Sequence, residues 1–327
     1  MRILIVTPAP PRSRKGNRVT AVRWARIMRE LGHTVAIAEE YRRQRCDLLV
    51  ALHALRSYPS ISRFRRLHPE SLSNLIVTLT GTDLYGDIRT DERARHALDL
   101  ADALIVLQSR GVDDLPEGVR AKARVIYQSI QRPPGLHRPG RDTCDICVIG
   151  HLRPVKDPFR AAEASRLLPA SSTIRVLHIG GALSDDMERQ AHREAAANPR
   201  YRWLGELPRW RTIRALARSR LLVLSSEMEG GAHVICEALA CGVPVLSSDI
   251  PGSVGLLGEA YPGYFPVGDT RALSELLLRC ETDSAFYTDL KHRCESLAAL
   301  VDPARETESW TELLAELGRA KRRSQPL

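Results

Sequence analysis

Residues Glu229–Asp249 read E-G-G-A-H-V-I-C-E-A-L-A-C-G-V-P-V-L-S-S-D and decide how the rest of the chain is interpreted. Glu229 lies in a Gly-Gly loop, and Glu237 lies on a predicted short helix that ends at the G-V-P and leads into an apolar strand. A helix that begins behind glycines offers free N–H groups and its positive dipole end to an anion. Carboxylates beside it accept hydrogen bonds from sugar hydroxyls. The stretch therefore predicts a nucleotide-sugar site rather than two solvated surface glutamates, with the diphosphate held by the backbone of Gly230, Gly231 and Ala232.

Apolar, strand-like runs alternate with helix-like segments along the chain, which is the pattern of doubly wound parallel sheets. One series begins at Arg2–Thr7 and a second at Cys144–Ile149. The segment Gln131–Arg141 between them has three prolines and two glycines and predicts a linker. We therefore expect an α/β protein with two Rossmann-like domains, at residues 1–135 and 142–302. Ligands of such sheets bind beyond the carboxyl ends of the strands, so the loops there, and a cleft between the halves, are the candidate site.

Composition narrows the class of protein. The chain has 327 residues and no apolar run near the roughly 20 residues of a membrane span, so no integral membrane segment is expected. Seven cysteines scattered through apolar segments argue against disulfides and indicate the cytoplasm, and the C-x-x-C at Cys144–Cys147 lacks a second pair of zinc ligands. The net charge of +9 comes mostly from arginine, and aromatic residues make up only 5%. Anionic small substrates therefore suit the charge better than nucleic acid.

Two more loops carry cations. The loop Gly150–Lys156 reads G-H-L-R-P-V-K, and positive charge there would stabilise a leaving nucleoside diphosphate. No D-x-D pair occurs in the sequence, so we expect no metal and no other cofactor. The segment Pro8–Arg18 predicts an anion site at the start of the first helix, with a solvated mobile loop as the alternative. Its candidate acceptor ligands are Arg12, Arg14, Lys15, Asn17 and Arg18, and Gly16 is a candidate donor ligand.

The E-x7-E pattern, followed by E-A-L-A-C-G-V-P-V, resembles the signature of retaining-type family 4 glycosyltransferases, which have the GT-B fold. The resemblance implies that Glu229 touches the donor sugar and that Glu237 holds the ribose hydroxyls. The family pattern G-R-L-x-x-x-K places its lysine on Lys156 and puts His151 in the arginine position, so Arg153 is a candidate replacement for that charge. It also implies that a last helix at 303–320 packs back onto the first domain.

Smaller patterns at strand ends predict acceptor ligands. His53 ends the D-L-L-V-A-L-H strand, where members of the family often place a histidine, and a purely structural histidine is the alternative. The segment that follows the next strand offers hydroxyls, a backbone amide and a carboxylate from Thr80, Thr82 and Asp83.

Several segments resemble a narrower group, the selenosugar synthases of selenoneine biosynthesis. They lie at 7–25, 79–85, 150–162, 198–210 and 250–258. This resemblance implies transfer of the sugar of a UDP-sugar, chiefly UDP-N-acetylglucosamine, to selenophosphate, with release of UDP and phosphate. Selenophosphate is a small anion and would suit the basic segment around Gly16. The alternatives are a family 4 transferase with a hydroxyl acceptor and a non-catalytic nucleotide-sugar-binding protein.

Overall fold

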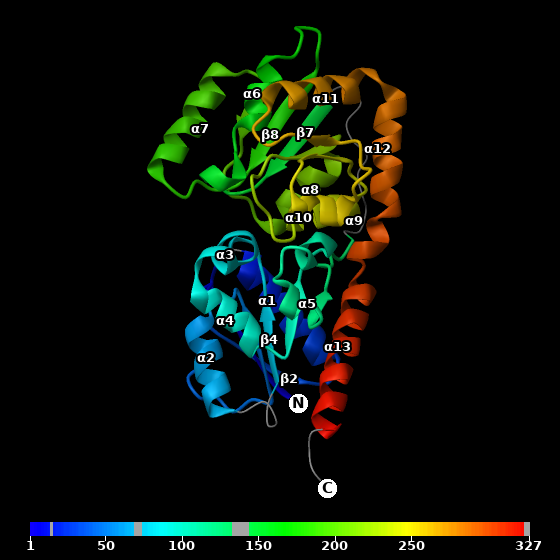
Figure 1. Cartoon of the computed structure of the whole chain (residues 1–327). Coiled ribbons are helices and arrows are strands. Elements are labelled where there is room, and N and C mark those ends of the chain that lie inside the picture. Colours follow the sequence, from blue (N-terminus) through cyan, green and yellow to red (C-terminus); the bar gives the residue numbers. More distant parts are fainter. Residues whose placement is uncertain (14–15, 69–73, 133–143, 324–327) are drawn as a thin grey trace. The chain divides into compact units, whose positions relative to one another are not determined.

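A computed structural model describes residues 1–13, 16–68, 74–132 and 144–323, which divide into two compact units (Figure 1). Unit 1 comprises Met1–Gln128 and Pro303–Leu327, and unit 2 comprises Ser129–Asp302. Most of the predicted linker, at 133–141, lies outside the described residues.

Unit 1 is built on a parallel sheet with the strand order β2-β1-β3-β4-β5-β6. All five residues of both β3 and β4 are buried, because both faces of the sheet are covered and their runs are almost wholly apolar. The strands are β1 (Arg2–Val6), β2 (Thr34–Ala38), β3 (Leu48–Leu52), β4 (Asn74–Thr78), β5 (Ala103–Val106) and β6 (Ala123–Val125). The helices are α1 (Gly16–Glu30), α2 (Tyr58–Leu67), α3 (Ile88–Thr90), α4 (Glu92–Leu100), α5 (Glu117–Arg120) and α13 (Pro303–Arg323), with short turns η1 (Asp83–Asp87) and η2 (Ser109–Val112).

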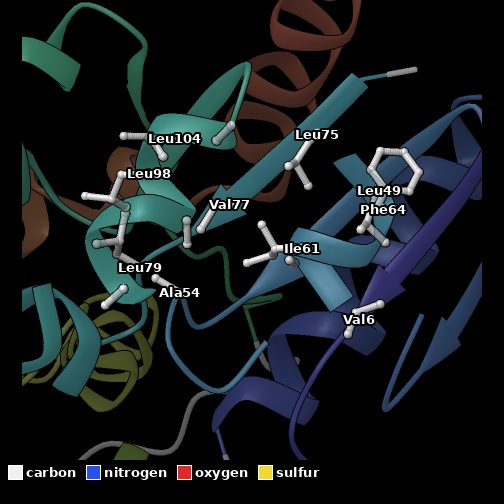
Figure 2. Close-up of a cluster of buried hydrophobic side chains, with 14 of the residues drawn as sticks. Val6, Leu49, Ala54, Ile61, Phe64, Leu75, Val77, Leu79, Leu98 and Leu104 are labelled. Carbon is white, nitrogen blue, oxygen red and sulfur yellow. The ribbon is translucent and has the colours of Figure 1, made fainter. Parts of the chain in front are cut away.

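Two buried clusters hold the helices of unit 1 on the sheet. One joins side chains of the strands to Ile61 and Phe64 of α2 and to Leu98 of α4, as Figure 2 shows. The other joins the strands to α1 and α13, where the rings of Trp24 and Trp310 meet edge to face at 4.9 Å between centroids. The last helix therefore packs onto the first unit.

Unit 2 repeats this plan, with a parallel sheet in the order β12-β11-β10-β7-β8-β9. Its helices start and stop where the local sequence favours it: Ser184 accepts a hydrogen bond from the N–H of Met187 at the start of α7, and α9 ends at Gly242, whose φ of +68° suits glycine. The strands are β7 (Cys144–Ile149), β8 (Ile174–Ile179), β9 (Tyr201–Trp203), β10 (Leu221–Leu224), β11 (Val245–Ser248) and β12 (Tyr264–Phe265). The helices are α6 (Arg160–Arg166), α7 (Asp185–Ala197), α8 (Arg209–Arg218), α9 (His233–Cys241), α10 (Pro251–Leu257), α11 (Thr270–Thr282) and α12 (Ser284–Ser296), with short turns η3 (Pro154–Lys156) and η4 (Ala298–Val301).

The cysteines are structural residues. All seven are buried and free. Burial raises the pKa of Cys144 to about 11 and that of Cys147 to about 12, so both thiols of the C-x-x-C stay protonated near neutral pH. In the part of the chain that the structure describes, no helix is both long and apolar enough to cross a membrane.

Candidate functional site

In unit 2, the loops that follow the neighbouring strands β7 and β10 are tied to each other. The N–H of Glu227 donates to the carbonyl of Val155 at 2.9 Å. The hydroxyl of Ser225 donates to the carbonyls of Asp157 at 2.8 Å and Lys156 at 3.3 Å. These bonds fix the Gly150–Lys156 loop against the loop that carries Glu229.

The two loops bring Lys156 and Glu229 together as an ion pair. The ammonium of Lys156 donates to Oε1 of Glu229, and the hydroxyl of Ser226 donates to the same oxygen at 2.7 Å. The side chains are 22% and 13% exposed, so the pair is shielded but still open to a ligand. Two residues that the sequence assigned to the donor, 73 positions apart, therefore meet at one point.

A third element fixes the position of Glu229. Helix α10 follows β11 and passes so close to the Glu229 loop that a Cβ built on Gly252 would lie 2.0 Å from the carbonyl oxygen of Glu229. No other residue fits there without moving one of the two segments.

The start of the Gly150 loop rests on a buried histidine. His178 of β8 meets the carbonyl of Gly150 through Nε2 at 3.1 Å and the hydroxyl of Tyr201 through Nδ1 at 3.0 Å. Because the carbonyl can only accept, Nε2 carries the proton and Nδ1 accepts from the tyrosine. Burial lowers the pKa of His178 to about 4 although the bond to Gly150 opposes this, so the ring is neutral. A small pocket opens here, lined by Val148, Ile149, Gly150, Lys156, Pro158, His178, Val223, Leu224, Ser225 and Ser226.

The two candidates for the second cation of this loop differ in their surroundings. The side chain of Arg153 is exposed, and it contacts no hydrogen-bond or ion-pair partner among the described residues. Nδ1 of His151 is buried, and within the described ranges it has no hydrogen-bond partner either. A ligand could therefore use either group.

Helix α9 presents an uncapped N-terminus. Gly230 and Gly231 precede it, its N-cap residue is Ala232, and no side chain caps its first N–H groups. Uncapped N–H groups at a helix start bind anions. The diphosphate site at these three residues stays a prediction.

Glu237 lies on α9 with its side chain only 6% exposed, and two basic side chains contact it. Nη1 of Arg209, the first residue of α8, lies 2.5 Å from Oε1, and Nδ1 of His233 lies 3.4 Å from the same oxygen. Burial alone would raise the pKa of Glu237, but His233 and Arg209 together hold it below its usual value. Sequence reasoning missed both residues. The i, i+4 spacing of His233 and Glu237 could have revealed the first, whereas nothing local links Arg209 to Glu237.

In unit 1, part of the basic segment can be placed. Helix α1 begins at Gly16, so Gly16, Asn17 and Arg18 form its first turn, not the preceding loop. Arg12 is exposed, and Nε of Arg18 is buried without a hydrogen-bond partner in the described part of the chain. Arg14 and Lys15 lie outside the described residues.

His53 ends β3 in an unusual conformation, because its φ of +76° is rare for a residue other than glycine. Nε2 lies 3.0 Å from the hydroxyl of Thr82, and Nδ1 accepts a hydrogen bond from the N–H of Arg56 at 3.3 Å. The carboxylate of Asp87 lies 3.8 Å from Nε2. Since Nδ1 is an acceptor, the neutral ring carries its proton on Nε2 and acts there as a donor.

Asp83 is used in a different way from the one its sequence position indicates. Its side chain is fully buried, and Oδ1 accepts from the N–H groups of Thr80 at 2.8 Å and Gly81 at 2.9 Å. Oδ2 accepts from the N–H of Ala54 at 2.9 Å. The carboxylate thus joins the loops after β3 and β4 and leaves the hydroxyls of Thr80 and Thr82 as the polar groups of this segment.

Metal ligands do not gather in the described ranges, where no group of three or more His, Cys, Asp and Glu side chains could hold an ion.

Residues 138–298, all of them in unit 2, match the family model described as glycosyl transferases group 1. Over these residues the chain is therefore similar to the glycosyl transferases of group 1. The matched segment contains the ion pair of Lys156 and Glu229, helix α9 and Glu237.

Similar proteins include one relative in sequence and several solved structures. The N-acetyl-alpha-D-glucosaminyl L-malate synthase of Bacillus anthracis is 32% identical over 79 residues, which are 24% of this chain and 21% of that enzyme. The structure of Anabaena HepE in complex with UDP and glucose is similar at a TM-score of 0.75 and 16% identity, covering 97% of this chain and all of HepE. Sucrose-phosphate synthase from Thermosynechococcus elongatus gives a TM-score of 0.79 at 16% identity, covering 98% and 99% of the two chains. The α/β class and the GT-B fold expected from the sequence are therefore confirmed.

Proposed function

We propose that this chain is a glycosyltransferase that transfers the sugar of UDP-N-acetylglucosamine to selenophosphate, as in selenoneine biosynthesis. The observation that carries the donor half is the ion pair of Lys156 and Glu229 within the segment similar to group 1, which also holds an uncapped helix N-terminus. The acceptor half rests on the resemblance to selenosugar synthases and on the basic start of α1.

Each part of the donor has a matching group in unit 2. The diphosphate binds the backbone N–H groups at the start of α9, and Lys156, with Arg153 or His151, neutralises the charge that develops as UDP leaves. Glu237 accepts the ribose hydroxyls and Glu229 a sugar hydroxyl. The choice of UDP follows HepE, whose structure contains UDP, and the choice of N-acetylglucosamine follows the name of the Bacillus anthracis enzyme.

Unit 1 supplies the acceptor site in this proposal. Arg18, whose Nε is buried without a partner among the described atoms, and the exposed Arg12 offer positive charge near the start of α1. A small anion such as selenophosphate needs such charge. The name of the Bacillus anthracis enzyme also pairs N-acetylglucosaminyl transfer with a small anion, L-malate.

The proposed chemistry needs no general base. Selenium of ionised selenophosphate attacks the anomeric carbon, and the bond from that carbon to the UDP oxygen breaks with its electron pair going to UDP. Water then cleaves the Se–P bond and releases phosphate and the selenosugar. A hydroxyl acceptor would require a base, but Asp83 uses both oxygens on backbone N–H groups, and Nδ1 of His53 is occupied by Arg56. An acceptor that is already ionised therefore fits these residues better.

A hydroxyl acceptor is the second candidate, because the Bacillus anthracis enzyme is named for the hydroxy acid L-malate. UDP and phosphate release from UDP-N-acetylglucosamine, measured with selenophosphate, with L-malate and with neither, separates the candidates. We expect UDP and phosphate in equal amounts with selenophosphate only, unaffected by EDTA. UDP release with malate alone would support the second candidate, and binding of UDP-sugar without turnover would support a binding protein.

The same assay tests whether the basic start of α1 binds the acceptor, with a second arginine of that helix as the control. Arg18→Ala should raise the KM for selenophosphate at least about tenfold, as expected when a charged hydrogen bond to an anion is lost. Arg26→Ala, on the same helix and in an exposed pair with Glu30, should leave it unchanged. An unchanged KM in Arg18→Ala would contradict the assignment of the acceptor to this segment.

A further inference from the structure

The contact between α8 and α9 brings a cation to a buried carboxylate. The side chain of Arg209 is 55% exposed, whereas the side chain of Glu237 that it contacts is 6% exposed. Arg209 is the first residue of α8, and the first turn of that helix contains no acidic residue. A cation at the positive end of a helix is unfavourable by about 0.3–1 kcal/mol. The carboxylate of Glu237 offsets this cost. The presence of an arginine at the first position of α8 is therefore explained by its contact with Glu237 and not by the local sequence of α8.

Two basic side chains, Arg209 and His233, approach the same oxygen of Glu237. Nη1 of Arg209 and Nδ1 of His233 lie 2.5 Å and 3.4 Å from Oε1 of Glu237, and neither of these contacts falls on Oε2. A carboxylate gripped through one oxygen cannot rotate freely, so its second oxygen points in a fixed direction. Such a carboxylate is preorganised to accept hydrogen bonds from two hydroxyl groups, because its side chain is already ordered before the ligand binds.

We propose that Arg209 is a positioning residue for the nucleoside part of the donor: it holds Glu237 ionised and oriented toward the ribose hydroxyls. His233, one turn before Glu237, assists from the same helix. This inference rests on the proposed function for Glu237, and it extends the donor site to α8, a helix that no motif in the sequence assigns to it.

Arg209 could act on the ribose through Glu237 or bind the diphosphate directly. These two roles predict opposite effects of Arg209→Ala on the affinity for ligands that lack the ribose hydroxyls or the diphosphate. We would measure binding of UDP, uridine and 2′,3′-dideoxy-UDP to the full-length protein by titration calorimetry. If Arg209 acts through Glu237, Arg209→Ala weakens UDP and uridine by about tenfold, the loss of one charge-assisted hydrogen bond, but leaves dideoxy-UDP unchanged. If Arg209 contacts the diphosphate directly, UDP and dideoxy-UDP weaken and uridine does not, which would overturn the proposal.

The variants around Arg209 complete the test. Arg209→Ala in a Glu237→Gln background should cause no further loss of UDP affinity, since the two residues act as a unit. Arg209→Lys should recover part of the affinity because it keeps the charge. Arg211→Ala is the matched control: this exposed neighbour stacks over Trp210 at 5.1 Å and should bind all three ligands like the wild type.

Failure of this inference differs from failure of the proposed function. If the wild-type chain binds UDP, and Arg209→Ala binds UDP and uridine as tightly as the wild type does, only the role of Arg209 is overturned. If the wild-type chain binds no UDP, the donor assignment itself is wrong and the role of Arg209 fails with it. Thermal unfolding of each variant confirms that the fold is kept, as the exposure of Arg209 leads us to expect.

Discussion

Lys156 and Glu229 form an ion pair, and the carbonyl of Glu229 lies where a side chain on Gly252 would stand. The cation and the carboxylate come from the loops after β7 and β10, and the glycine comes from helix α10 after β11. These three strands are neighbours in the sheet through the order β11-β10-β7. Because the carboxyl ends of parallel strands meet at one edge, residues far apart in the sequence converge there.

Lys156→Ala should lower kcat for UDP release by about a hundredfold to a thousandfold, the effect of losing one group that stabilises developing charge. Binding of the donor should weaken much less, because the N–H groups of α9 still hold the diphosphate. Lys291→Ala serves as the control, since this lysine forms only an exposed pair with Glu295 at 3.7 Å. Equal losses of kcat in both variants would contradict a role for Lys156 in leaving-group departure.

Gly252→Ala should displace the Glu229 loop, because the new Cβ would lie 2.0 Å from its carbonyl oxygen. Strain of this kind costs about 1–3 kcal/mol of unfolding free energy. We expect that loss in urea denaturation together with at least a tenfold lower kcat/KM. Gly318→Ala in α13, where a Cβ meets nothing within 4 Å, should instead stabilise the chain by about 0.5–1 kcal/mol. A Gly252→Ala variant with wild-type activity would show that the position of Glu229 is not critical.

The sequence predicts the fold and the donor loops because both depend on local patterns. The apolar runs of β3 and β4 are buried throughout, as strands covered on both faces must be. The Gly-Gly loop before α9 and the spacing of Glu229 and Glu237 are likewise readable from consecutive residues. In each case the residues that determine the structure are close in the chain.

The partners of these residues could not be predicted, because they depend on tertiary contacts. Arg209 meets Glu237 across 28 positions, and Asp83 meets the N–H of Ala54 across 29. From the sequence, Asp83 is predicted to offer its carboxylate to the acceptor after a strand end. In the folded chain its carboxylate accepts hydrogen bonds from three backbone N–H groups. The T-G-T-D sequence alone does not reveal these bonds, because one of the donors, Ala54, is distant in the chain.

The neutral state of His178 makes unit 2 sensitive to acid. Burial lowers the pKa of this ring to about 4, below the ordinary value of about 6.5 that it has in the unfolded chain. The unfolded state therefore takes up the proton first as the pH falls, and stability that is complete above about pH 6.5 is lost progressively toward pH 4. The loss from this group amounts to about 3 kcal/mol.

His178→Gln should remove this part of the pH dependence, because an amide can donate to Gly150 and accept from Tyr201 without titrating. Urea denaturation at pH 7 and pH 5 measures it: the difference between the two pH values should be smaller in the variant than in the wild type. His192→Gln, which replaces an exposed histidine of α7, should keep the wild-type difference. An unchanged pH dependence in His178→Gln would mean that other groups govern acid unfolding.

Among the positions of α13, substitution of Glu306 should lower the unfolding free energy of unit 1 the most. Its carboxylate has no exposure and accepts hydrogen bonds from Nε1 of Trp24 at 2.7 Å and from Nε of Arg23 at 3.0 and 3.1 Å. Removing one partner of a buried pair leaves the other charge uncompensated, at a cost of about 3–5 kcal/mol. We expect Glu306→Ala to lower the unfolding free energy of unit 1 by that amount, measured by urea denaturation followed through tryptophan fluorescence. Glu308→Ala, an exposed glutamate of the same helix, should change it by less than about 0.5 kcal/mol. If the two variants unfolded alike, the contact of Glu306 with α1 would not be what holds the last helix on unit 1.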